Sequence, residues 1–129
     1  MLNELISQSE ALVFFTGAGI STNSGIPDFR GPKGIWKTSQ PIYFQDFVNS
    51  KEKRIESWER KFSNELNIYK AKPNQGHLKI AEIMNKKDLS HLITQNVDNL
   101  HQESGLSDSQ ITELHGNATY AKCLDCQLR

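Results

Sequence analysis

The sequence has little of anything that would set it apart from ordinary small globular proteins. It contains two cysteines, four prolines and no excess charge, since 15 basic residues balance 15 acidic ones. Without a positive excess there is no broad electrostatic attraction to a polyanion, so we expect no nucleic-acid partner. A length of 129 residues suits one domain of ordinary size.

Long hydrophobic runs are missing as well. The apolar run from Ala11 to Phe15 is far shorter than the roughly 20 residues that a membrane helix requires. The first residues carry Glu4 and Glu10 without a basic cluster, unlike a secretory signal peptide. We therefore expect no membrane partner and a cytoplasmic location. In such a reducing compartment, Cys123 and Cys126 indicate metal ligation or redox chemistry rather than a structural disulfide.

What is present is an alternation of strand-like and helix-like segments. Apolar runs indicate strands at 12–15 and 89–94, and a third, shorter strand at 111–114. The first run suits a strand buried on both faces of a parallel sheet. Helical spacing marks 2–9, 55–69 and 74–84. Asn74 is a good N-cap for the last of these, and the order of the segments predicts an α/β fold.

Residues 23–37 differ in composition from their surroundings. Glycine, proline and polar residues dominate this stretch, which predicts a long loop rather than regular structure. Long loops in compact domains are usually either functional or disordered. The apolar residues Ile26 and Phe29 favour an ordered, functional loop.

A glycine-rich turn, Gly17-Ala18-Gly19, follows the first predicted strand. Glycines at this point let the backbone approach a ligand closely, and the start of the next helix offers free N–H groups to a phosphate. The usual dinucleotide fingerprint has a third glycine where Thr22 stands here. The residues alone therefore leave both nucleotide binding and a simple tight turn open.

A polar cluster follows the second predicted strand. Gln95, Asn96 and Asp98 lie at the carboxyl edge where open α/β sheets place their ligands, and they suit contacts to a sugar and an amide. The alternative is structural, because Asp98 is also a good helix N-cap.

Two further motifs lie near the end of the sequence. His115 follows the third predicted strand and suits a general base, although a lone histidine is often structural. Cys123 and Cys126 form one C-x-x-C, which supplies two of the four ligands of a structural zinc site. A thioredoxin-like redox motif is the alternative, and it fits less well because no helix-forming sequence follows it.

Together, these motifs resemble the successive signatures of the sirtuin family. The segments that carry the resemblance are 17–30 (GAGISTNSGIPDFR), 94–101 (TQNVDNLH), 114–116 (LHG) and the cysteine pair at 123–126. Their order and approximate spacing also match, and the resemblance extends over almost the whole chain from about Leu2.

The resemblance implies an α/β fold with a Rossmann-like parallel sheet and flanking helices. Residues 1–117 would form the N-terminal part of an NAD-binding catalytic domain, with the cofactor-binding loop and a helical insert within 30–75. Residues 118–129 would form the first half of a zinc-binding module. Sirtuins usually continue well past this length, so the sheet and the zinc module would both be incomplete.

The resemblance also implies a role for each matching residue. The NAD phosphates would be held by Gly17, Ala18, Gly19 and Ser21. The mobile cofactor-binding loop would contain Asp28, Phe29 and Arg30, with Phe29 screening the reactive ribose carbon. Gln95 would bind the nicotinamide ribose, and Asn96 and Asp98 would hold the nicotinamide amide. His115 would be the general base, and Cys123 and Cys126 would be zinc ligands.

The activity implied is the NAD-dependent removal of acyl groups from protein lysine side chains, with release of nicotinamide and O-acyl-ADP-ribose. Relatives that favour acidic acyl groups carry a Tyr-x-x-Arg motif, which is absent from 55–62, so acetyl is preferred. We expect the 129 residues alone to be inactive. Three alternatives stay open: a non-catalytic NAD- or ADP-ribose-binding module, a truncated inactive product, and a protein ADP-ribosyltransferase.

Overall fold

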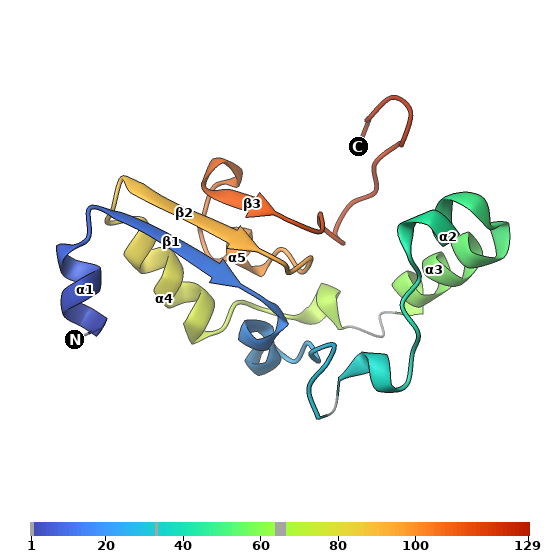
Figure 1. Ribbon diagram of the computed structural model, residues 1–129, viewed down its shortest axis with the longest axis horizontal. Helices are drawn as coiled ribbons and strands as arrows, with labels where there is room; N and C mark the ends of the chain where they lie inside the picture. The colour runs from blue at the N-terminus through green and yellow to red at the C-terminus, as the bar shows by residue number, and fades with distance from the viewer. Residues whose placement is uncertain (1, 33, 64–66) are drawn as a thin grey trace.

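A computed structural model describes residues 2–32, 34–63 and 67–129, and its centre is a three-stranded parallel sheet (Figure 1). The strands β1 (Ala11–Thr16), β2 (Leu89–Thr94) and β3 (Ile111–Glu113) lie in that order. The register pairs Thr94 with Thr16 on one side and with Glu113 on the other. The carboxyl ends of all three strands therefore meet at one edge, and the three predicted strands are confirmed.

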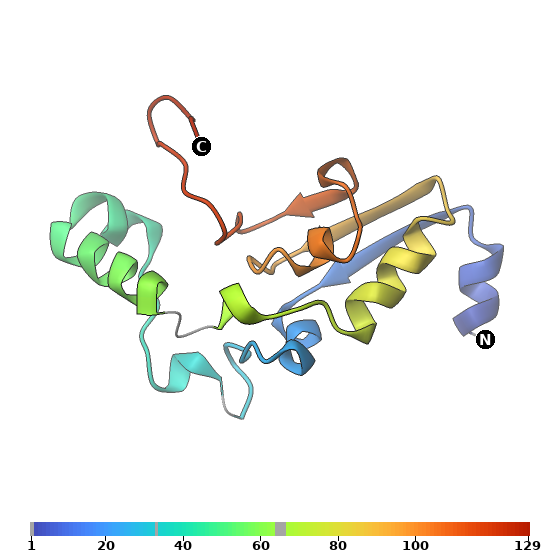
Figure 2. The ribbon, with the colours of Figure 1, turned by 180° about the vertical axis from the view of Figure 1, so that it is seen from behind.

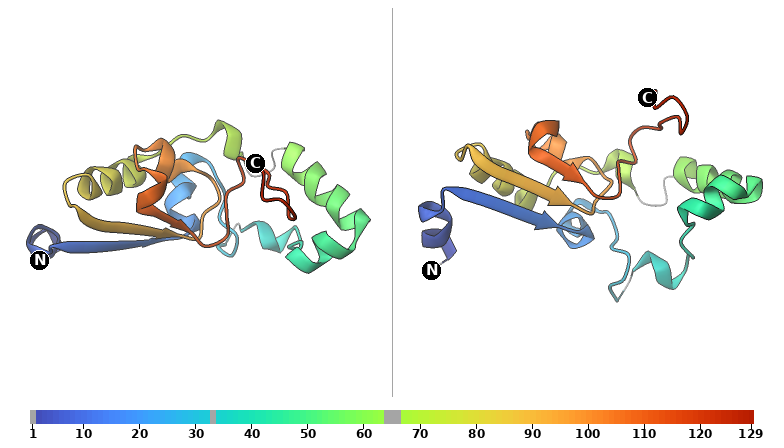
Figure 3. Two further views of the ribbon diagram at one scale, coloured as in Figure 1. Left: turned by 90° about the horizontal axis from the view of Figure 1, so that it is seen from above. Right: turned by 45° about the horizontal axis from the view of Figure 1, so that its top comes forward.

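The helices divide into two groups. Beside the sheet lie α1 (Leu2–Gln8), α4 (Gln75–Met84) and α5 (Leu100–Glu103). The pair α2 (Phe44–Asn49) and α3 (Lys51–Ser63) stands apart from the sheet in every view (Figures 1, 2 and 3). Short 3-10 helices are η1 (Ala18–Ser24), η2 (Ile35–Lys37), η3 (Ile68–Lys70) and η4 (Asp108–Gln110). The predicted helices at 2–9 and 74–84 are thus confirmed.

The helix predicted over 55–69 is wrong in its second half. α3 ends at Ser63, and Tyr69 lies in the separate helix η3, while Leu66 falls outside the described residues. Asn67, the residue before η3, has a φ of 54°, which is left-handed and incompatible with a continuous α-helix. Asparagine tolerates this conformation better than most residues, so the chain turns there.

The core lies between the sheet and α4. Ala81 and Met84 of α4 pack against Leu92 of β2 and against Leu106. The opposite face of the sheet is open, with Val13 68% and Phe15 63% exposed. The expectation that the first strand is buried on both faces is therefore wrong for this structure, because α4 packs on only one face and alternate strand residues point away from it.

The long loop is ordered where its apolar residues indicated. Ile26 packs with Ala71 and Leu100 in a second buried cluster, which ties the loop to α5. Regular structure reaches both ends of the predicted loop, since η1 and η2 overlap it. Gly25 ends η1 with a φ of 84°, a conformation that suits glycine. Among the described residues, no helix combines the length and apolar character needed to cross a membrane.

Candidate active site

The loops that follow the three strands border a cavity of about 510 Å³ at the carboxyl edge of the sheet. Its lining consists of Ala18, Asp28, Phe29, Arg30, Gly31, Trp36, Gln95, Asn96, Val97 and His115. The structure thus brings the glycine-rich turn, the long loop, the polar cluster and the candidate base to one cavity, although these segments are far apart in the sequence.

Hydrogen bonds between backbone groups of residues 28–36 hold the loop that forms one wall of this cavity. The N–H of Ile35 donates to the carbonyl of Asp28 at 3.0 Å, and the N–H of Trp36 donates to that of Phe29 at 3.1 Å. The Trp36 ring lies 5.4 Å from the ring of Phe29 and 4.5 Å from the guanidinium of Arg30. Trp36 therefore positions two predicted site residues by aromatic and cation–π contacts. Sequence reasoning missed it, although a tryptophan within the predicted loop was a usable signal.

Ser21, Asn96 and Asp98 form a buried network beneath the cavity. The Ser21 hydroxyl donates to Oδ2 of Asp98 at 2.6 Å and accepts from Nδ2 of Asn96 at 3.1 Å. Oδ1 of Asp98 accepts from the N–H of Leu100, the first residue of α5. The N-cap of α5 is Asn99, not Asp98 as the structural alternative predicted, but the Asp98 carboxylate still accepts from the first N–H of the helix and also orients a residue of the cavity lining. The side chains of Ser21 and Asp98 do not line the cavity itself.

His77 extends this network from α4. Its Nδ1 accepts from the N–H of Asn74, so the ring proton is on Nε2, which lies 3.4 Å from the Ser21 hydroxyl. Burial lowers the pKa of His77, and the charge of Asp98 opposes this only in part. Sequence reasoning placed His77 only on a helix face. The Asn74-x-x-His77 capping box was the signal that could have indicated its hydrogen bond to the helix start.

The network does not form a nucleophilic serine–histidine–aspartate triad. Such a triad needs a serine that donates to the histidine and reaches the substrate. Here Ser21 is fully buried and its hydroxyl proton goes to the aspartate. Ser21 therefore acts as a link that holds Asn96 and Asp98.

The glycines of the first turn lie at the rim. A Cβ atom at Gly17 would come 3.7 Å from Nε2 of Gln95, and at Gly19 it would meet nothing within 4 Å. The following helix η1 is of the 3-10 type, and its β-branched, serine and asparagine residues are weaker α-helix formers than alanine or leucine. Only Ala18 of this turn lines the cavity, so the phosphate-binding roles of the turn stay predictions.

His115 is solvent-exposed, follows β3 closely and belongs to the cavity lining. The next residue, Gly116, has a φ of 75°, which glycine adopts without strain. The chain can therefore turn away directly after the histidine and leave its ring accessible to a ligand.

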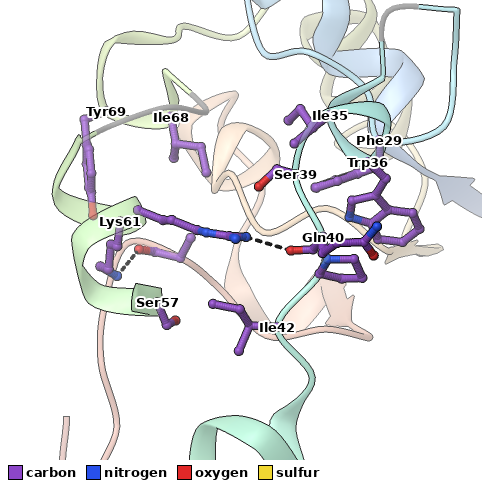
Figure 4. Close-up of a pocket in the computed structure, with 13 residues that line it drawn as sticks. Phe29, Ile35, Trp36, Ser39, Gln40, Ile42, Ser57, Lys61, Ile68 and Tyr69 are labelled. Carbon is purple, nitrogen blue, oxygen red and sulfur yellow. Dashed lines mark hydrogen bonds between the residues drawn. The ribbon is translucent and has the colours of Figure 1, made fainter. Parts of the chain in front are cut away.

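A second cavity of about 310 Å³ adjoins the first (Figure 4). Phe29 and Trp36 belong to the lining of both, so their side chains form a shared wall. Lys61 of α3 and Ala118 also line this second cavity, and Nζ of Lys61 donates to the carbonyl of Ala118 at 2.6 Å. This bond links α3 to the C-terminal residues beside the long loop.

The two cysteines lie outside both cavities. Cys123 and Cys126 are exposed, free thiols in a turn closed by the N–H of Gln127 donating to the carbonyl of Cys123. Hydrogen bonds from the backbone N–H groups of Cys126 and Asp125 lower the pKa of the Cys123 thiol, which favours the thiolate. Across the part of the chain that the structure describes, no group of three or more potential metal ligands is found. The pair supplies half of a tetrahedral donor set.

Comparisons with known proteins agree on one family. The sequence model of the Sir2 family matches residues 17–129. An NAD-dependent protein deacetylase of Rhodopseudomonas palustris is 48% identical over 128 residues, which cover 99% of this chain and 51% of the relative. NAD-dependent protein deacetylase 1 of Bradyrhizobium diazoefficiens is 49% identical over 125 residues, covering 97% and 49%. The chain spans about half the length of the curated relatives it matches.

Solved structures show the same likeness. A Sir2 mutant with a deacetylated p53 peptide and 3′-O-acetyl ADP-ribose has a TM-score of 0.82 at 39% identity, covering 98% of this chain and 50% of that one. A Sir2 complex with a p53 peptide and NAD⁺ has a TM-score of 0.77 at 39% identity, covering 98% and 49%. The predicted fold class, an incomplete Rossmann-like parallel sheet with flanking helices, is confirmed. The chain belongs to the Sir2 family.

Proposed function

We propose that this chain supplies the cofactor cleft and the general base of an NAD-dependent protein-lysine deacetylase. The observation that carries the proposal is the lining of the 510 Å³ cavity, where His115, Gln95 and Asn96 face the loop residues Phe29 and Arg30. A base, two amides, an aromatic ring and a cation around one cavity suit a ligand with a sugar, an amide and phosphates. The names of the most similar relatives support the same activity.

In this proposal NAD is the co-substrate, and it supplies an electrophilic ribose carbon when nicotinamide leaves. Asn96 binds the nicotinamide amide, with Asp98 orienting Asn96 through Ser21. Gln95 binds the ribose. Ala18 with Gly17 and Gly19 brings backbone N–H groups to the phosphates, where Arg30 adds a positive charge. Ser21 supports this turn from η1, beneath the cavity.

The remaining residues exclude water and move a proton. Phe29, backed by Trp36, screens the ribose carbon so that water does not reach it. The acyl oxygen of the substrate lysine then bonds to that carbon, and His115 accepts the proton of a ribose hydroxyl so that the oxygen can attack the acyl carbon. Asp28 fixes the loop that carries Phe29, because its Oδ1 accepts from the N–H of Gly31 at 3.0 Å.

The substrate is an acylated lysine of a protein, with acetyl as the preferred acyl group. The missing Tyr-x-x-Arg in the helical insert supports an uncharged acyl group. The two free thiols support a cytoplasmic location. We place the cofactor domain at 1–117, with the loop and helical insert at 30–75.

Residues 118–129 are the first half of a zinc module in this proposal. Cys123 and Cys126 fit zinc as thiolate donors, and two further ligands would complete the tetrahedron. A bound zinc would hold this arm and would take no part in the proton transfer at His115.

The test joins this chain to the C-terminal half of the Rhodopseudomonas palustris deacetylase. We expect this joined protein to release nicotinamide from NAD only when an acetyl-lysine peptide is present. His115→Ala should reduce turnover at least about a hundredfold, the usual contribution of a general base, while NAD binding persists. The matched control is His91→Ala, because His91 lies on β2 outside the cavity lining.

Other outcomes would identify the other candidates. NAD binding without nicotinamide release, in a folded joined protein, would indicate a non-catalytic ADP-ribose-binding module. Transfer of labelled ADP-ribose to protein instead of acetyl would indicate an ADP-ribosyltransferase. Normal turnover by the His115→Ala variant would remove the general-base role.

A further inference from the structure

A second buried histidine lies beside the site network and has no part in the function proposed above. His101 of α5 is 1% exposed, and its ring lies 4.9 Å from the ring of His77. Its Nε2 is 2.9 Å from Oγ1 of Thr16, the last residue of β1. Its Nδ1 is the one buried side-chain nitrogen or oxygen without a hydrogen-bond partner among the described residues.

The hydrogen bonds around Thr16 fix the tautomer of His101. The Thr16 hydroxyl donates its only proton to Oγ1 of Thr94 at 2.9 Å. Thr16 must therefore accept from His101, which places the ring proton on Nε2. Nδ1 then carries only a lone pair, and no donor in the described chain reaches it.

The same bonds connect His101 to the cavity. Oγ1 of Thr94, the last residue of β2, accepts from Thr16 and also from the backbone N–H of Asn96 at 3.0 Å. Asn96 then reaches Ser21 with its side chain and belongs to the cavity lining. The order of the contacts is His101, Thr16, Thr94 and Asn96.

Packing alone does not account for an imidazole at this position. A buried nitrogen without a partner lowers stability, whereas a phenyl ring would fill the same space without that cost. What imidazole adds is an in-plane N–H directed at Thr16. The ring is also held neutral: burial above all, and then the charge that His77 can carry, lower the pKa of His101 to about 4 against an opposing effect of Asp98.

We propose that His101 is a positioning residue for the nicotinamide-amide pocket: its Nε2–H fixes the hydroxyl pair of Thr16 and Thr94, and this pair holds the backbone of Asn96 at the cavity. The role of Asn96 in that pocket rests on the proposed function, whereas the tautomer and the hydroxyl pair do not. His101 lines neither of the two cavities described above, so its effect is transmitted through the ends of β1 and β2.

The first test determines which ring nitrogen of His101 carries the proton. Long-range proton–nitrogen correlation spectra of the 15N-labelled joined protein distinguish protonated from bare ring nitrogens. We expect His101 to carry its proton on Nε2 and to have a bare Nδ1 at neutral pH. A proton on Nδ1, or on both nitrogens, would overturn the proposal whether or not the chain binds NAD.

The second test compares two replacements of His101. The amide nitrogen of His101→Gln can occupy the place of Nε2 and donate to Thr16, whereas the shorter His101→Asn cannot reach it. We expect His101→Asn to weaken NAD binding about tenfold, the effect of losing one hydrogen bond. ADP-ribose has no nicotinamide, so its affinity should change less than about twofold, and His101→Gln should restore NAD binding.

Matched variants separate this role from general stability. His91→Asn is the control, because Nε2 of His91 also bonds a threonine, Oγ1 of Thr112 at 2.8 Å, but on the open face of the sheet. Thr16→Val breaks the same link from its other end and should reproduce the loss of NAD affinity. Equal losses for NAD and ADP-ribose in His101→Asn would indicate a merely structural residue and contradict the proposal.

If the joined protein with the wild-type chain binds no NAD, the proposed function fails, and the spectra alone then test the role of His101. The side-chain amide signal of Asn96 should then move in His101→Asn and Thr16→Val and stay in place in His101→Gln. An unmoved Asn96 signal in all three variants would overturn the proposal.

Discussion

At the scale of single residues, Gly34 shows how closely the long loop over residues 23–37 folds on itself. A Cβ atom at this position would lie 2.5 Å from both the carbonyl carbon and the oxygen of Phe29. These are backbone atoms, so they cannot move aside without opening the bonds from Ile35 and Trp36 that close the loop. The hydrogen atom of glycine is therefore what lets the loop close.

We predict that Gly34→Ala opens the loop and weakens NAD binding about tenfold or more, because Phe29 and Arg30 lose their positions at the cavity. In a Trp58→Phe background Trp36 is the only tryptophan, so its fluorescence reports the loop directly. Thr38→Ala is the control, since its exposed hydroxyl bonds only the nearby Ile35 carbonyl. An unchanged Trp36 spectrum and NAD affinity in Gly34→Ala would contradict the prediction.

At the scale of elements, the start of α4 fastens the glycine-rich turn to the sheet domain. Oδ1 of Asn74 accepts from the N–H of Gly76 at 2.8 Å and caps the helix. Nδ2 of the same side chain donates to the carbonyl of Ile20 at 2.7 Å and to Oγ of Ser24 at 2.9 Å, both in η1. One amide thus links two elements that are far apart in the sequence.

Two substitutions separate these functions of Asn74. Asn74→Asp keeps the capping oxygen and loses the donor to η1, whereas Asn74→Ala loses both. We expect urea unfolding of the joined protein to show a loss of about 1 kcal/mol for Asp and about 2–3 kcal/mol for Ala. No loss in Asn74→Asp would mean that the bonds to Ile20 and Ser24 contribute nothing, and equal losses in the two variants would mean that the capping oxygen contributes nothing. Ser109→Ala, in the exposed helix η4, should stay within about 0.5 kcal/mol.

Elements with local causes were predictable from the sequence, and those with tertiary causes were not. The apolar runs of β1 and β2 and the cap at Asn74 are signals carried by neighbouring residues, and the structure confirms them. The break at Asn67 depends on a left-handed backbone that asparagine permits but does not require.

The residues of the candidate site also divide into those that the sequence could predict and those that it could not. The glycine, amide and histidine motifs predicted which segments form the cavity. The contact between the rings of His77 and His101 escaped prediction, because it exists only once α4 and α5 lie on one face of the sheet. The shared wall at Trp36 likewise depends on how the loop closes.

At the scale of the whole molecule, one face of the sheet is covered and the other exposes apolar side chains, and the interior holds many buried polar residues beside its apolar core. Thr16, Ser21, His77, Thr94, Asn96, Asp98 and His101 are all buried. The open face instead exposes Val13 and Phe15 to solvent. Buried neutral histidines make the stability of such a molecule sensitive to acid, because unfolding lets each of them take up a proton.

The sign and range of this pH dependence follow from His101. Its pKa is about 4 in the folded state, below the ordinary value of 6.5, so between these limits the unfolded chain binds more protons and the free energy of unfolding rises with pH. The groups that face the ring are His77, whose pKa is also lowered, and Asp98, which opposes the effect. The exposed Glu82, whose pKa hydrogen bonds from Lys79 and Lys86 lower to about 2, loses its stabilising charge only below about pH 4.5.

We therefore predict that lowering the pH from 7 to 5 reduces the free energy of unfolding by about 2 kcal/mol through His101. Urea unfolding at pH 5, 6 and 7 measures this in the joined protein. His101→Gln cannot take up the proton, so its unfolding free energy should change less over the same pH range. His91→Asn keeps His101, so its unfolding free energy should depend on pH as that of the wild type does. If His101→Gln and the wild type lose the same stability between pH 7 and 5, His101 is not the group that titrates. The claim that His101 is neutral in the folded protein would then be wrong.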